Sequence, residues 1–103
     1  MSTGGERRRA PRYAMVLPIR TADPGIGRVF GVTRDVSSSG VYFYTEVPDW
    51  RAGGRVEFVF QFPPQITGEQ ATALCRGTVM RSEEAESVRG VAVRIDRFQL
   101  LDT

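Results

Sequence analysis

Residues 55–62 carry the sequence RVEFVFQF, in which apolar and polar side chains alternate. One face of this segment carries a valine and three phenylalanines, Val56, Phe58, Phe60 and Phe62. The opposite face carries Glu57, Val59 and Gln61. A period of two is that of a β-strand, whose side chains point alternately to the two sides of a sheet, and not that of a helix. The segment therefore predicts a strand with one face in a core.

Further segments of this kind recur along the chain, separated by breaks rich in glycine, proline, serine and aspartate. The predicted strands occupy residues 13–22, 27–35, 41–46, 55–62, 71–81 and 88–96. Residues 98–101 are expected to begin a short helix. Six short strands without helical periodicity bury their apolar faces by closing on themselves. The predicted fold is therefore all-β, a six-stranded antiparallel barrel over residues 13–103, preceded by a flexible basic arm over residues 1–12.

The composition fits a single globular domain, since 41% of the residues are hydrophobic and 25% are charged. The sequence has no apolar run long enough for a membrane span and no signal peptide, and its single cysteine, Cys75, fits a reducing compartment. We therefore expect a cytoplasmic protein that is not inserted in a membrane. The absence of histidine argues against a metal site and against histidine-based catalysis, and no nucleophile–base pair is available. We expect no enzyme activity, no catalytic residues and no cofactor.

Positive charge is concentrated near the start of the chain. All 14 cationic residues are arginines, and Arg7, Arg8, Arg9 and Arg12 lie within six positions, although the net charge is only +2. A protein that coats DNA or RNA needs more positive charge than this. A local arginine cluster on a nearly neutral domain indicates instead a single phosphate-bearing ligand.

The first motif is ERRRAPR at residues 6–12, in which Arg8 and Arg12 have R-x-x-x-R spacing. The planar guanidinium group binds a phosphate or the O6/N7 edge of guanine through two hydrogen bonds, and it stacks on bases. Pro11 keeps the segment extended, so successive arginines point in different directions. Taken alone, the segment is more typical of a solvated basic tail.

The second motif is DVSSSG at residues 35–40, with D-x-S-x-x-G spacing, at the junction of two predicted strands. An ionised Asp35 accepts hydrogen bonds and matches the N1–H and amino group of guanine, while Ser37 offers a hydroxyl. Gly40 allows either a close approach to a ligand or a positive φ. Taken alone, this motif is also typical of an ordinary turn.

Together, the two motifs resemble those of the PilZ domain family, bacterial receptors for cyclic di-GMP. Residues 77–79 and 89–93 resemble later strands of that family. The resemblance implies a barrel that binds cyclic di-GMP, changes conformation and signals to a downstream protein. The ligand-binding residues that it implies are Arg8, Arg9, Arg12, Asp35, Ser37 and Gly40. Where some members carry a base-stacking aromatic residue or arginine, this chain has Met80 and Arg81.

Two alternatives remain open. One is a PilZ-like interaction domain that does not bind a nucleotide. The other is a small barrel that binds RNA, since Tyr42 and Tyr44 lie near Arg28 and Arg34 in the sequence. The second alternative requires exposed aromatic and basic side chains that alternate along a strand face.

Overall fold

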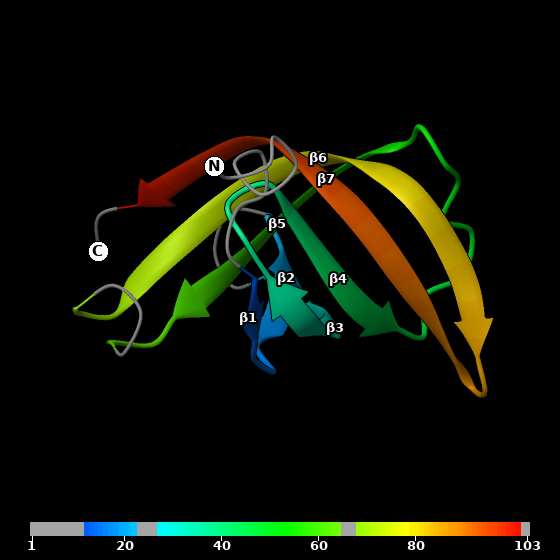
Figure 1. The fold of residues 1–103 in the computed structure, drawn as a ribbon, viewed down its shortest axis with the longest axis horizontal. Helices are drawn as coiled ribbons and strands as arrows, with labels where there is room; N and C mark the ends of the chain where they lie inside the picture. Colours follow the sequence, from blue (N-terminus) through cyan, green and yellow to red (C-terminus); the bar gives the residue numbers. More distant parts are fainter. Residues whose placement is uncertain (1–11, 23–26, 65–67, 102–103) are drawn as a thin grey trace, which may run out of the picture.

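The computed structural model describes residues 12–22, 27–64 and 68–101 (Figure 1). Seven strands follow one another along the chain: β1 (Tyr13–Ala14), β2 (Pro18–Thr21), β3 (Val29–Val36), β4 (Gly40–Thr45), β5 (Arg55–Phe62), β6 (Ala71–Ala85) and β7 (Val88–Leu101). Their pairings are all antiparallel. Within the described ranges, no helix has the length and apolar character needed to cross a membrane.

The strands close into a barrel. Their order is β3-β2-β5-β6-β7-β4, and β4 pairs back onto β3, so that six strands complete the ring while β1 extends the edge of β3 beside β2. In Figure 1, β6 and β7 form a long curved hairpin that spans the width of the molecule. The predicted fold class, an all-β six-stranded antiparallel barrel, is confirmed.

The predicted first strand is divided into β1 and β2, and a side chain of β3 holds the residues between them. Thr33 of β3 is buried, and its hydroxyl donates to the carbonyl of Met15 at 2.6 Å and accepts from the N–H of Leu17 at 2.8 Å. These side-chain contacts join β3 to the residues between the two short strands, beside the backbone bond from the Thr33 N–H to the Leu17 carbonyl at 2.9 Å. Thr33 therefore fixes the path of the chain that leads out of the N-terminal motif.

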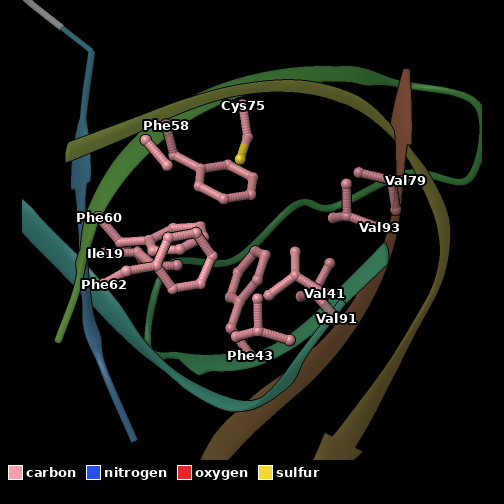
Figure 2. Packing of buried hydrophobic residues seen from close by; sticks show 12 residues of the cluster. Ile19, Val41, Phe43, Phe58, Phe60, Phe62, Cys75, Val79, Val91 and Val93 are labelled. Atoms are coloured by element: carbon pink, nitrogen blue, oxygen red, sulfur yellow. The ribbon is translucent and has the colours of Figure 1, made fainter. Parts of the chain in front are cut away.

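The core lies inside the ring and is rich in phenylalanine. Figure 2 shows Phe43 of β4 and Phe58 of β5 among side chains contributed by the surrounding strands. Both residues are fully buried, and their ring centroids lie 6.0 Å apart in a T-shaped arrangement, which is a favourable aromatic geometry. The inward face predicted for residues 55–62 is confirmed, since Phe58, Phe60 and Phe62 are all buried.

The short helix expected at residues 98–101 is wrong, because these residues continue β7 as far as Leu101. Phe98 pairs with Cys75 of β6, and its ring centroid lies 6.0 Å from that of Phe62. Pairing along β6 and this apolar contact hold the segment in an extended conformation, and tertiary packing of this kind overrides weak local propensity.

The hairpin between β6 and β7 is also tighter than expected. The connection between the predicted strands 71–81 and 88–96 is mostly strand, because the ladder continues to the pair Ala85–Val88. Glu86 adopts a positive φ of 59° in the two-residue connection that remains. The ladder therefore carries Glu83 and Glu84 on β6 instead of in a loop.

Candidate ligand-binding site

Arg12, the described residue of the first motif, meets the second motif on the outside of the barrel. β1 pairs with the end of β3, with Ala14 opposite Asp35, so that Arg12 lies beside Asp35. The Arg12 Nη1 atom donates to Asp35 Oδ1 at 2.7 Å. The Arg12 side chain is 64% exposed, whereas that of Asp35 is 13% exposed. An exposed cation from the first motif thus covers a nearly buried carboxylate of the second motif.

Ser37 and Gly40 form the turn between β3 and β4. The Ser37 N–H donates to the Gly40 carbonyl at 2.8 Å, and the Ser37 hydroxyl accepts from the N–H groups of Ser39 and Gly40 at 3.2 and 3.0 Å. The same hydroxyl donates to the Gly40 carbonyl oxygen at 3.2 Å. Ser37 is buried. Its side chain therefore organises the turn, which is the local role that serine commonly plays.

The turn is fixed against β7. The Ser39 carbonyl accepts from the Ile95 N–H at 2.9 Å. A Cβ atom on Gly40 would lie 3.1 Å from the carbonyl oxygen of Val93, so this glycine permits the close approach of the two backbones. The φ of Gly40 is not positive, so the alternative role predicted for it, a positive φ, is wrong. Its other predicted role, a close approach to a ligand, stays a prediction.

Asp35 has a second partner that the motifs did not indicate. The Arg34 Nε–H donates to Asp35 Oδ2 at 2.7 Å, and the Arg34 guanidinium carbon lies 3.9 Å from the centroid of the Tyr42 ring. The hydrogen bond with Asp35 raises the pKa of Arg34. Arg34 remains a cation under all ordinary conditions, so a cation–π contact with the ring is available throughout.

Tyr42 lies on the outer wall but is only 4% exposed. Its hydroxyl donates to Glu83 of β6 at 3.1 Å, and the Tyr44 ring meets it edge-on with centroids 5.6 Å apart. Burial first, and then the hydrogen bond to Glu83, raise the pKa of Tyr42. The ring therefore forms a fixed surface that carries Arg34. The sequence shows Tyr42 and Tyr44 near Arg34 along the chain, but its pattern did not indicate this contact.

The remaining residues singled out in the sequence are Arg8, Arg9, Met80 and Arg81. Arg8 and Arg9 lie outside the described residues. Met80 occurs where β6 shifts register between Val79 and Arg81, and it is 50% exposed. Arg81 is also exposed and lies 3.5 Å from Glu83, the partner of Tyr42. The described part of the site thus combines Asp35, two arginines and a fixed turn on one outer wall.

These features define a small antiparallel barrel module with a polar site built from two separate motifs on its outer wall. The PilZ domain family matches residues 6–102, and the chain belongs to this family. Domains of this family are binding or adaptor modules. None of the curated proteins matches the sequence.

A solved structure with a similar fold is that of the Bacillus subtilis inhibitor of motility, MotI/DgrA. The TM-score is 0.71, the sequences are 13% identical, and the similarity covers 90% of this chain. The chain spans 44% of that protein. At this identity the similarity supports the fold of this chain and not its function.

Proposed function

We propose that this PilZ domain is a receptor for cyclic di-GMP that signals to a protein partner. The observation that carries the proposal is the contact between Arg12 and Asp35, which brings one residue of each motif into a single site. Membership of the PilZ family supports the choice of ligand, because its domains typically bind this nucleotide.

The chemistry of the two residues suits the two parts of the ligand. A carboxylate such as Asp35 accepts hydrogen bonds from the N1–H and amino group of a guanine. An arginine such as Arg12 binds a phosphate or the O6/N7 edge of a guanine with two parallel hydrogen bonds. Arg8 and Arg9 add cations within four positions of Arg12 in the sequence. Binding of the ligand then breaks the ion pair between Arg12 and Asp35, and both residues contact the ligand instead.

The low cost of opening this ion pair supports the exchange. Ion pairs between exposed partners stabilise proteins by about 1 kcal/mol or less, and Asp35, although only 13% exposed, keeps its bond to Arg34 when Arg12 leaves. Arg12 is an exposed partner, since most of its side chain is in solvent. Movement of the residues that precede β1 would then follow ligand binding and would present a changed surface to the protein partner.

The alternative of an RNA-binding barrel finds less support. Single-stranded RNA binds to exposed aromatic rings on which successive bases stack. Tyr42 is buried beneath Arg34 and is not available as such a platform. The other alternative is an interaction domain without nucleotide affinity, and a direct measurement of nucleotide binding distinguishes it from a receptor.

The proposal is tested by isothermal titration calorimetry with cyclic di-GMP, run beside GTP. We expect a Kd of about 1 μM or tighter for the cyclic dinucleotide. Arg12→Ala should weaken binding by about tenfold or more, because a charged hydrogen bond is lost. Arg28→Ala removes an exposed arginine next to β3, away from Asp35, and should leave the affinity unchanged. Absence of binding heat for the unmodified protein would overturn the proposal and favour the interaction domain.

A further inference from the structure

Both carboxylate oxygens of Asp35 are engaged, and by different arginines. Oδ1 accepts from Arg12 and Oδ2 accepts from Arg34, each at 2.7 Å. Each oxygen of a carboxylate has capacity for two hydrogen bonds, so Asp35 can hold a permanent donor and still receive another group. A guanine edge places two donors side by side, and the carboxylate must therefore be held in the correct orientation to meet both.

Both arginines are partly exposed, the Arg34 side chain at 48%, and they differ in what holds them. Arg12 lies just before β1, and its side chain is 64% exposed. Arg34 is part of β3, and its guanidinium group lies over the ring of Tyr42 while it donates to Asp35. The guanidinium plane of Arg34 is thus held both by the Tyr42 ring and by the hydrogen bond to Asp35. Arg12 is the partner that can leave at low cost, and Arg34 is the partner that stays.

The platform beneath Arg34 is itself fixed. Tyr42 is buried, is contacted edge-on by Tyr44 and donates its hydroxyl to Glu83 across the wall. A connected set of contacts therefore runs from β6 through Tyr42 and Arg34 to the carboxylate. Rigid support of this kind improves binding because less conformational freedom is lost when a ligand arrives.

We infer that Arg34 is a positioning residue: it stays on Tyr42 and holds Asp35 in place while the nucleotide displaces Arg12. This inference rests on the proposed function. Arg34 acts on the guanine through Asp35, so its removal reduces discrimination between guanine and adenine. Arg12, as a ligand of phosphate or of the guanine edge, contributes mainly to affinity.

The test compares the unmodified protein with Arg34→Ala and Arg34→Lys by calorimetry, using cyclic di-GMP and cyclic di-AMP. We expect both variants to lose about tenfold or more in affinity for cyclic di-GMP, with little change for cyclic di-AMP, since an oriented charged hydrogen bond is lost. Lysine keeps the charge but lacks the planar group that stacks and donates through Nε, so it does not restore discrimination. Unchanged affinity and discrimination in Arg34→Ala, or full recovery in Arg34→Lys, overturns the inference.

A measurement on the unmodified protein covers the case in which a variant does not fold. The contact with the Tyr42 ring predicts a ring-current shift of the Arg34 Nε–H signal in NMR spectra, and this shift should persist at saturating cyclic di-GMP. Loss of the shift on binding overturns the role of Arg34 while the receptor function stands. If the unmodified protein binds no cyclic di-GMP, the proposed function fails first and the inference fails with it.

Discussion

The hydroxyl of Tyr42 occupies the space above Gly90 that a side chain would fill. A Cβ atom built on Gly90 would lie 1.9 Å from the Tyr42 hydroxyl oxygen and 2.7 Å from the ring carbon that bears it. The ring can lie against the barrel wall because β7 has no side chain at this position. The platform for Arg34 thus depends on a glycine that lies 48 positions further along the sequence than Tyr42.

Gly90→Ala is therefore expected to displace the Tyr42 ring and to break its hydrogen bond with Glu83. Overpacking of this kind costs about 1–3 kcal/mol, which denaturant unfolding measures. The control is the same substitution in a Tyr42→Ala background, where the clash is absent and the cost should be much smaller. An equal cost in both backgrounds would contradict the contact.

Thr33→Val is expected to loosen the connection between β1 and β2. The substitution keeps the shape of the buried side chain but removes the donor to Met15 and the acceptor for the Leu17 N–H. Loss of these buried partners should lower the free energy of unfolding by about 1–3 kcal/mol. Thr72→Val, on the opposite part of the barrel in β6, is the matched control with little expected effect. Equal stability of the two variants would show that the Thr33 hydroxyl does not hold this segment.

Ser37→Ala should loosen the turn between β3 and β4, because the hydroxyl accepts from two backbone N–H groups. We expect a loss of about 1 kcal/mol in stability and faster amide hydrogen exchange at Ser39 and Gly40. Ser38 lies in the same turn and is exposed, so Ser38→Ala should leave both quantities unchanged. Unaltered exchange in Ser37→Ala would remove the structural role assigned to this hydroxyl.

Burial raises the pKa of the Cys75 thiol to about 12. The folded protein therefore keeps the thiol proton where the unfolded chain, with an ordinary pKa near 9.0, has lost it. Stability should fall as pH rises from about 9 to about 12, with a slope from this group of at most about 1.4 kcal/mol per pH unit. Urea unfolding at several pH values measures the slope, and Cys75→Ala should reduce it. Rapid labelling of the native thiol at pH 8 would contradict the burial.

The barrel could be predicted from the sequence because its strands have clear patterns. The alternation over residues 55–62 indicates which side chains enter the core, and turn-forming residues mark most strand ends. The end of β7 could not be predicted in this way, since Phe98 is held extended by Cys75 and Phe62, which are distant in the sequence. The division of the first strand likewise depends on a single distant hydroxyl, that of Thr33.

The site could be predicted in part. The motif spacing indicated Arg12 and Asp35, and the structure brings these two together, whereas Arg8 and Arg9 lie outside the described residues. Arg34 and Tyr42 are not among the predicted ligand-binding residues, because they are joined by a contact between neighbouring strands and not by spacing along the chain. Only the pairing of β3 with β4, which sets Asp35 opposite Tyr42, makes that contact visible.

The most direct test of the central claim is an NMR titration of the unmodified protein with cyclic di-GMP, followed through the backbone amides. Binding at the junction of the two motifs predicts that the largest shift changes fall on residues 12–14 and 34–40, with smaller changes on the adjoining part of β7. Residues 55–62, whose strand lies elsewhere in the ring, should change little. Saturable shifts confined to another face of the barrel, or no shifts at all, would contradict the account.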